Sequence, residues 1–390
     1  MTRLHLRRGR AKPLWHGHPW VYSGAVARVE GECAPGDVVE VVDFEGRVIG
    51  RGFSNPRSQI VCRLATWRAD EALDAAWLAR RMGEAIALRR RLGLPSDRTD
   101  AYRLVNSEGD GLPGLVVDVY GDVAAVQFTA LGLQLRAEEV FDSIERALGP
   151  RAIVEVGGQA FAEAEGFVPQ VGPRRGEAVA VARVRENGLA FEVDLYAGQK
   201  TGLFLDQREN HEAFGALARG ARVLDLHAYA GGFALHAARG GAASVVAVDV
   251  SRRAVERARE NALTNGLAIL AVEADAFHYL EAAPRESFDL VACDPPKFAR
   301  ARKDLDAALK GYRRLNALAM AAVARGGVLL TCSCSQLVSE EDFQRVIAGA
   351  AVDARRTARL LRVSHQAQDH LVPVGFPEGQ YLKCLWLAIQ

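Results

Sequence analysis

The feature that most constrains the fold is a regular alternation of short apolar runs with segments of helical periodicity, from about residue 190 onward. Strands that alternate with helices in this way form a parallel sheet with helices on both faces. The sequence therefore predicts a doubly wound, mostly parallel α/β domain over residues 186–390. A long helix is expected at 304–325, ended by the glycine pair that follows it. The predicted strands are 223–226, 244–250, 269–272, 288–293, 328–332 and a last, antiparallel run at 381–389.

Two further regions precede this domain and differ from it in texture. Residues 1–70 are rich in Gly and β-branched side chains, and short turn signals separate runs that are typical of strands. This pattern indicates a small β-barrel. Residues 71–185 begin with a segment of helical periodicity closed by Gly93 and Pro95, and paired strands and another helix follow. We therefore expect an α+β middle domain there.

Composition excludes several classes of protein. No window approaches the roughly 18 uninterrupted apolar residues of a membrane helix. The N-terminus is basic but lacks the apolar run of a secretory signal, so we expect a cytoplasmic protein without a membrane partner. The six cysteines do not have the spacing of zinc ligands, so neither a metal site nor a disulfide framework is expected.

Four aspartates mark the carboxyl edge of the predicted parallel sheet. Asp225 lies late in its strand, whereas Asp249, Asp275 and Asp294 lie at or just beyond strand ends. Ligands bind at this edge in doubly wound sheets. Asp249 is placed to accept both ribose hydroxyls of an adenosine group, and Asp275 is placed to accept from an adenine amino group. Gly231 would allow close approach of the backbone to a ligand.

Two alternatives apply to this edge. Each aspartate alone could instead cap the helix that follows it. A dinucleotide is disfavoured, because the segment after the first strand lacks the G-x-G-x-x-G loop that nucleotide phosphates require.

Several motifs carry a resemblance to a known family. LDLHAYAGGF, AVDVS, ADAF and DPPKF resemble the class I S-adenosylmethionine methyltransferase pattern, which has a Rossmann-like fold. The sequence is similar over nearly its whole length to bacterial large-subunit ribosomal RNA cytosine-5 methyltransferases, which carry an N-terminal PUA domain. That closer similarity rests on GHPWVYSGAV (17–26), RLVNSEGDGLPGLVVDVYGD (103–122) and GQKTGLFLDQREN (198–210).

The resemblance implies a cofactor, partners and further site residues. S-adenosylmethionine is the implied cofactor, and residues 1–70 are the implied PUA-like domain. The implied partner is 23S ribosomal RNA or an assembling large subunit, and the family resemblance also suggests a homodimer. Phe204, Asp206 and Arg208 are implied to lie close to the cofactor.

Residues at the ends of two neighbouring predicted strands indicate the chemistry. The prolines after Asp294 hold a rigid loop, in which this carboxylate can orient a base. Cys332 and Cys334 lie at the end of the next strand. C5 of a pyrimidine is a poor nucleophile until a thiolate adds to C6, so a cysteine here favours C5 methylation by covalent catalysis.

Cys334 is favoured as the nucleophile. Its spacing to Glu340-Glu341 resembles the spacing between nucleophile and helix in related pyrimidine methyltransferases, and Cys332 could support it. Many RNA cytosine-5 enzymes have a second cysteine just after a D-P or A-P dipeptide, whereas this chain has Lys297 near that position. The base that removes the C5 proton is therefore unassigned.

The N-terminal region offers side chains for RNA binding, and the function has rivals. Arginines precede any acidic residue there, and Trp15, His16, His18 and Trp20 could grip backbone and bases. The tryptophans could equally fill the barrel core.

Three alternative functions remain for the chain: uridine-C5 methylation, exocyclic-nitrogen methylation and a non-catalytic RNA-binding assembly factor.

Overall fold

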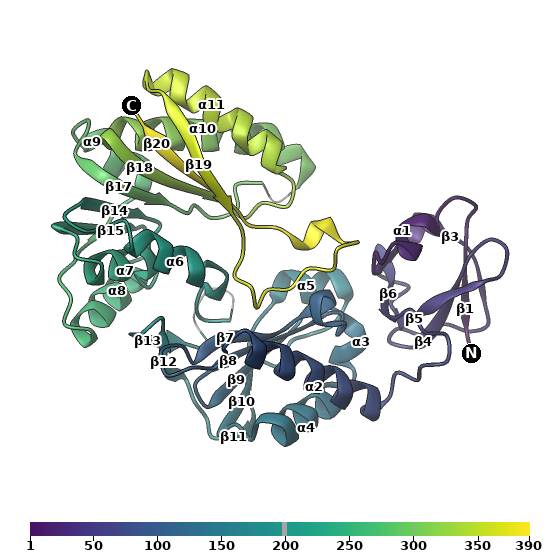
Figure 1. Cartoon of the computed structure of the whole chain (residues 1–390). Coiled ribbons are helices and arrows are strands. Elements are labelled where there is room, and N and C mark those ends of the chain that lie inside the picture. Colours follow the sequence, from purple (N-terminus) through teal and green to yellow (C-terminus); the bar gives the residue numbers. More distant parts are fainter. Residues whose placement is uncertain (197–200, 300) are drawn as a thin grey trace. The chain divides into compact units, whose positions relative to one another are not determined.

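The computed structural model describes residues 1–196, 201–299 and 301–390. Its contacts divide the chain into two compact units (Figure 1). The first unit comprises residues 1–185, 193–205 and 368–379, and the second comprises 186–192, 206–367 and 380–390. Residues 368–379 therefore belong to the first unit, although the chain on either side of them belongs to the second.

The first unit begins with a six-stranded sheet in the order β2-β6-β5-β4-β1-β3. The predicted strands near residues 38–64 are confirmed as β4, β5 and β6. The core of this sheet contains Leu6, Val21 and Leu64. Its elements are β1 (Arg3–Leu6), α1 (Lys12–Trp15), β2 (Trp20–Tyr22), β3 (Val26–Glu30), β4 (Val38–Val42), β5 (Val48–Ser54) and β6 (Ile60–Thr66).

The rest of the first unit is a five-stranded sheet, β11-β10-β9-β8-β7, with helices packed against it. The helix predicted after residue 71 begins at Ala75, and the side chain of Asp74 before it accepts from the Trp77 amide and so caps the first turn. The elements are α2 (Ala75–Arg91), β7 (Ala101–Asn106), β8 (Leu115–Tyr120), β9 (Val123–Phe128), α3 (Leu131–Gln134), α4 (Ala137–Leu148), β10 (Ala152–Glu155), α5 (Gln159–Glu165) and β11 (Gly172–Gly176). A hairpin of β12 (Val181–Glu186) and β13 (Leu189–Asp194) follows.

The second unit confirms the doubly wound sheet. Its order is β16-β15-β14-β17-β18-β20-β19, parallel from β16 to β18, with β20 antiparallel to both neighbours. The strands are β14 (Arg222–Leu226), β15 (Ser244–Asp249), β16 (Leu270–Glu273), β17 (Phe288–Cys293), β18 (Val323–Ser333), β19 (Ala358–Ser364) and β20 (Lys383–Ile389). The helices are α6 (Arg208–Gly215), α7 (Gly232–Arg239), α8 (Arg252–Thr264), α9 (Ala276–Ala282), α10 (Leu305–Ala322) and α11 (Glu340–Ala354).

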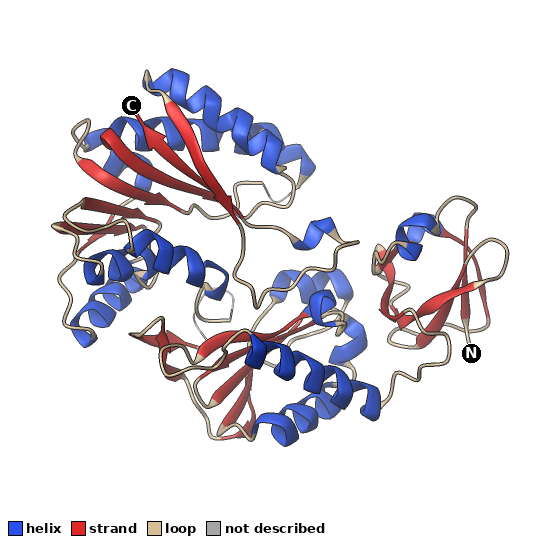
Figure 2. Cartoon of the chain, in the orientation of Figure 1, coloured by secondary structure: helices blue, strands red, loops and turns tan. Residues whose placement is uncertain are grey.

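Helices cover both faces of this sheet (Figure 2). On one face, Phe214 of α6 and Phe233 of α7 pack in a core with residues of β14, β15 and β17. On the other face, Leu280 of α9, Tyr312 of α10 and Phe343 of α11 belong to a second core. A sheet with a core on each face needs strands that are apolar throughout, which is the pattern that the sequence shows.

One predicted boundary is wrong. The helix expected to reach residue 325 ends at Ala322, and β18 already begins at Val323. Val323 pairs with Phe288 of β17, so these residues gain ladder hydrogen bonds instead of another helical turn. Gly326 has a φ of +82° inside the strand, and the register shifts there. The glycine pair therefore marks a bulge rather than a helix end.

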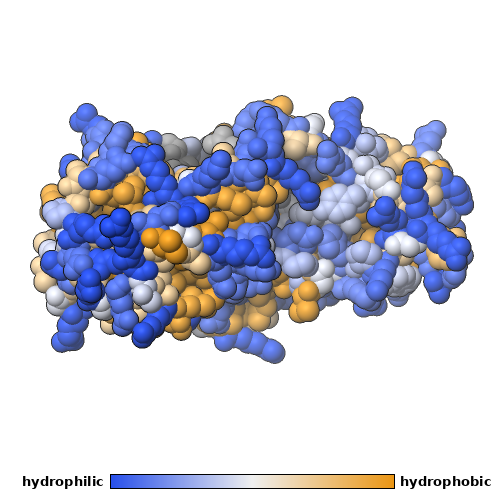
Figure 3. Space-filling view, turned by 90° about the horizontal axis from the view of Figure 1, so that it is seen from above, coloured by the Kyte–Doolittle hydropathy of each residue, from blue (hydrophilic) through white to orange (hydrophobic). Residues whose placement is uncertain are grey.

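None of the helices in the described part of the chain is long and apolar enough to span a bilayer. On the face drawn in Figure 3, hydrophobic patches are broken up by hydrophilic side chains.

Candidate active site

The strands β14, β15, β17 and β18 end at one edge of the parallel sheet. The order of the strands reverses at β14, because β14 is bonded to β15 on one side and to β17 on the other. Ligands of doubly wound folds bind at such a switch point. The sequence-predicted aspartates lie along this edge: Asp225 in β14, Asp249 at the end of β15, Asp275 just after β16 and Asp294 just after β17.

Among the four aspartates at this edge, Asp225 is the most deeply buried. Its side chain is 1% exposed, and its Oδ2 accepts from the Ala234 amide at 2.9 Å. Its Oδ1 is buried and has no hydrogen-bond partner among the residues that the structure describes. Burial raises the pKa of Asp225 to about 7. A buried carboxylate oxygen without a donor is unfavourable, so this site is suited to a ligand that brings a cationic donor.

Asp249 and Asp275 already bind backbone amides. Asp249 accepts from the Tyr229 amide at 2.9 Å and from the Ser251 amide at 2.8 Å. Asp275 is exposed and caps α9 through the amides of Phe277 and His278. The alternative role of helix capping therefore holds for Asp275. Each carboxylate oxygen has further lone-pair capacity, so capping leaves both side chains able to accept from a ligand.

The loop between β14 and α7 is packed into an unusual backbone conformation. His227, Tyr229 and Gly231 all have φ between +48° and +87°. A Cβ on Gly231 would lie 2.3 Å from Leu235 Cδ1, and one on Gly232 would lie 2.4 Å from the His211 ring. These glycines therefore fit the loop against neighbouring side chains, in addition to any ligand contact.

Sequence reasoning missed His227 in this loop. Its Nε2 is buried without a hydrogen-bond partner among the described residues, and burial lowers its pKa against the opposing charges of Asp249 and Asp275. The signal that could have found it is its place two residues after Asp225, in the turn that precedes Gly231.

Residues 204–208, which precede β14 in the chain, include a side chain that contacts the D-P-P-K loop (294–297) at the end of β17. Asp206 accepts from the Tyr381 hydroxyl at 2.6 Å, and Arg208 is 5% exposed in the first turn of α6. Gln207 donates from Nε2 to Asp294 Oδ2 at 2.9 Å, a contact that sequence reasoning missed. Phe204 belongs by its contacts to the first unit. The start of the predicted signature, 198–200, lies outside the described residues.

The structure separates the two cysteines of β18. Cys332 is 0% exposed and its Sγ lies 3.2 Å from Sγ of Cys384, its cross-strand partner. Burial raises the pKa of Cys332 well above its ordinary value. Cys334 follows Ser333, the last residue of β18, and is half-buried. Although β18 ends before Cys334, the Cys334 side chain packs against the same core cluster that contains Cys332 and Cys384.

Asp294 and Cys334 leave neighbouring strands at the same edge. β17 and β18 pair Cys293 with Thr331, so Asp294 follows that pair by one residue and Cys334 by three. Cys293 is fully buried, and burial raises the pKa of its thiol. Of the three cysteines at the ends of these two strands, Cys334 alone is partly accessible. The thiol of Cys334 and the carboxylate of Asp294 therefore lie at the same carboxyl edge of the parallel sheet as Asp225 and Asp249.

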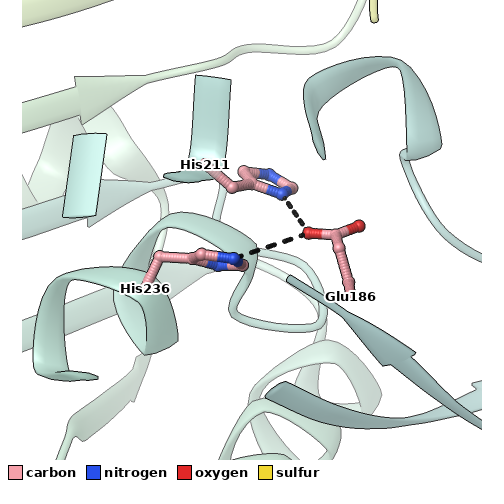
Figure 4. Close-up of side chains that lie close together, drawn as sticks. All are labelled: Glu186, His211 and His236. Carbon is pink, nitrogen blue, oxygen red and sulfur yellow. Dashed lines mark hydrogen bonds and ion pairs between the residues drawn. The ribbon is translucent and has the colours of Figure 1, made fainter. Parts of the chain in front are cut away.

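Glu186, His211 and His236 form a buried cluster (Figure 4), and the His211 ring lies against Gly232. His211 Nδ1 is 2.7 Å from Glu186 Oε1, and His236 Nε2 is 4.0 Å from the same oxygen. Two ligands of one tetrahedral zinc ion would lie about 3.3 Å apart, so the shorter distance fits a hydrogen-bonded ion pair better. Burial favours the neutral form of Glu186, but the neighbouring His211 outweighs this effect and holds the pKa of Glu186 below its usual value. The pair therefore braces α6 against the hairpin strand β12.

Comparison with known proteins gives two family models. A PUA-like domain matches residues 4–67, and an S-adenosylmethionine-dependent methyltransferase matches residues 171–361. Ribosomal RNA large subunit methyltransferase I of Shewanella denitrificans is 40% identical over 390 residues, and that of Erwinia tasmaniensis is 38% identical over 388 residues. Both matches cover 98% of each chain.

Solved structures agree on the fold. A putative methyltransferase from Streptococcus mutans superposes with a TM-score of 0.85 at 21% identity, and a putative methyltransferase complexed with SAH superposes with 0.86 at 22% identity. Each covers 100% of both chains. The predicted fold class is therefore confirmed: a PUA-like domain is followed by a mixed α/β chain that ends in a mostly parallel methyltransferase fold.

Proposed function

We propose a specific reaction for this chain, which belongs to the ribosomal RNA large subunit methyltransferase I family and depends on S-adenosylmethionine. The chain transfers a methyl group to C5 of a cytosine in 23S ribosomal RNA through a covalent adduct between Cys334 and C6. The observation that carries the proposal is the half-buried thiol of Cys334 beside the loop of Asp294, at an edge where Cys293 and Cys332 are fully buried.

Cofactor binding is assigned to the edge of β14, β15 and β16. The orphaned Oδ1 of Asp225 fits the ammonium of a bound amino acid group, and Asp249 and Asp275 keep lone pairs for ribose and adenine. Bound S-adenosylmethionine supplies an electrophilic methyl group. Gly231 is assigned to this site because a glycine allows close approach of the backbone. The family resemblance adds Phe204, Asp206 and Arg208, of which Asp206 and Arg208 are buried.

The chain's own residues supply the activation of the base. The Cys334 thiolate adds to C6, and the electron pair of the C5–C6 double bond becomes available at C5 for bonding to the methyl carbon. A base then removes the C5 proton, the double bond re-forms and the S–C6 bond breaks, which regenerates the thiolate. Asp294, oriented by Gln207, accepts from the exocyclic amine of the cytosine. A carboxylate acceptor favours cytosine over uridine, whose corresponding atom is a carbonyl oxygen.

The RNA side of the proposal rests on the PUA-like domain. Trp15 is 46% exposed and Tyr22 is 43% exposed, so these rings are available to stack on bases rather than filling the barrel core. Trp20 is half-buried, and its Nε1 donates to Glu108 Oε1 at 2.7 Å. The target cytosine must leave its stack to reach a thiolate, so unpaired 23S RNA or an assembling large subunit in the cytoplasm is the proposed substrate.

The test is methylation of purified 23S ribosomal RNA with labelled S-adenosylmethionine, followed by nucleoside analysis. We compare the wild type with Cys334→Ala, and use Cys332→Ala as the matched control. Label in 5-methylcytidine that only Cys334→Ala abolishes supports the proposal. An N-methylated base, 5-methyluridine, or activity that survives Cys334→Ala contradicts it.

A further inference from the structure

The proposed mechanism leaves open what converts the Cys334 thiol into a thiolate. We propose that Lys383 is a positioning residue for this step: its amine accepts the Cys334 proton and remains beside the sulfur as the counter-cation. The inference rests on the proposed covalent reaction. It deepens that reaction, because it assigns the group that prepares the nucleophile.

The strand register places Lys383 next to the nucleophile. Lys383 is the first residue of β20, and it pairs with Ser333, the last residue of β18. Its Nζ donates to the Ser335 carbonyl at 2.7 Å. The backbone of Lys383 is thus bonded on one side of Cys334 and its side-chain nitrogen on the other. The amine is therefore held across the turn that carries the thiol.

Within the described part of the chain, the buried Lys383 has no carboxylate at ion-pair distance. Its side chain is 5% exposed, and among the described residues its Nζ makes one hydrogen bond, to a neutral carbonyl oxygen. An ammonium carries three donors, so two directions are left for the thiolate and the substrate. A buried ammonium that lacks an anion is unfavourable, and a neighbouring thiolate would supply that anion. The ammonium of Lys383 and the thiolate of Cys334 therefore stabilise each other, so the charge of each group depends on the charge of the other.

The charges around Lys383 poise the amine for proton exchange. Burial, helped by the like charge of Lys297 in the D-P-P-K loop, lowers its pKa to about 8. The opposing charges are those of Cys334, Cys384 and Glu340 at the start of α11. An amine with this pKa is about one-tenth neutral at pH 7, a far larger share than for an ordinary lysine with a pKa of about 10.4.

Other groups at this edge are committed elsewhere. Tyr312 interacts with Ser333 at 3.1 Å, and burial raises the pKa of its phenol, so it is a poor proton acceptor. Glu340 is engaged by His365 at 3.0 Å. Asp294 accepts from Gln207. Lys383 consequently combines basicity with a fixed place beside Cys334.

The test measures the protonation of Cys334 without relying on methyl transfer. The full chain is alkylated with iodoacetamide across pH 5.5–10, and mass spectrometry follows the Cys334 peptide. The wild type should show a midpoint at least one pH unit below the value of about 8.5 for a free thiol. Lys383→Met should raise that midpoint by one unit or more, whereas Lys383→Arg keeps the charge and should restore most of the shift. Lys310→Met, an exposed lysine of α10, is the matched control and should leave it unchanged.

Two outcomes overturn the inference. A wild-type midpoint at or above 8.5 does so whatever the variants do, and this result stays available if Lys383→Met does not fold. An unshifted midpoint in folded Lys383→Met does so as well. Failure of the proposed function looks different: the alkylation profile would depend on Lys383 while Cys334→Ala still methylated RNA.

Discussion

The carboxamide of Gln207 donates to the carboxylate of Asp294 at 2.9 Å. This bond joins the segment that precedes β14 to the D-P-P-K loop, which is proposed to hold the base. Gln207 is 1% exposed, and its Oε1 accepts from Asn210 at 2.7 Å. Both ends of the amide are therefore fixed. A side chain fixed in this way orients one carboxylate oxygen of Asp294.

Loss of this bond should impair catalysis more than cofactor binding. A hydrogen bond to a charged group contributes about 1.5–3 kcal/mol, so Gln207→Met should lower kcat for RNA methylation by roughly 10- to 100-fold. The measurement is steady-state methylation together with calorimetric binding of S-adenosylhomocysteine, whose affinity should change less than threefold. Gln344→Leu, on the exposed face of α11, is the control. An equal loss of affinity and rate would show that Gln207 serves the cofactor instead.

Asp225 should make cofactor binding depend on pH. Its pKa is raised to about 7 by burial, so below that pH the cofactor-free chain carries a neutral carboxyl group. Affinity for S-adenosylhomocysteine, whose ammonium needs the charged form, should rise as the pH increases from 6 to 8. Asp225→Asn should weaken binding at pH 8 by about 10-fold or more and flatten the profile. Calorimetry between pH 5.5 and 8.5 measures both. A wild-type profile as flat as that of the variant would contradict the assignment.

The same residue should reduce the stability of the cofactor-free chain. An acid whose folded pKa lies above its unfolded value of about 3.9 lowers stability as the pH rises, by at most about 4 kcal/mol once the pH exceeds 7. Asp225→Asn removes this charge, so the variant should unfold at a higher urea concentration than the wild type at pH 8, and at a similar one at pH 4. A lower midpoint for the variant at pH 8 would show that the charged carboxylate is already well satisfied.

Cys332 should be dispensable for activity. It packs against Cys384 in a fully buried cross-strand pair, so Cys332→Ala removes one sulfur from the core and should cost about 1–2 kcal/mol of stability. Methylation at 25 °C should stay within a few-fold of the wild type. Urea unfolding and the labelled-RNA assay measure the two effects. A loss of activity as large as that of Cys334→Ala in a folded variant would move the nucleophile to Cys332.

The sequence predicted the secondary-structure elements that have a periodic pattern, but not the contacts between residues that are far apart in the chain. The order of strands and helices in the second unit follows from period and from glycine stops, because each signal is local. The four aspartates could be placed at one edge since parallel strands share their carboxyl ends. Gln207 and Lys383 could not, because their roles depend on which strand lies beside β18 and on burial. The pairing of Cys332 with Cys384 depends on the register of β20, which no local pattern encodes.

His236 and Glu186 should set the acid limit of stability. Burial lowers the pKa of His236 to about 4, below its unfolded value of about 6.5. Its contribution is therefore complete above pH 6.5 and is lost as the pH falls toward 4, by roughly 3 kcal/mol. Urea unfolding at pH 7.5 and pH 4.5 should show this loss in the wild type and less of it in His236→Asn.

Because the distance between His211 and Glu186 fits an ion pair, EDTA should leave the Tm unchanged. A Tm that falls with chelator and recovers with zinc would instead identify the cluster as a metal site.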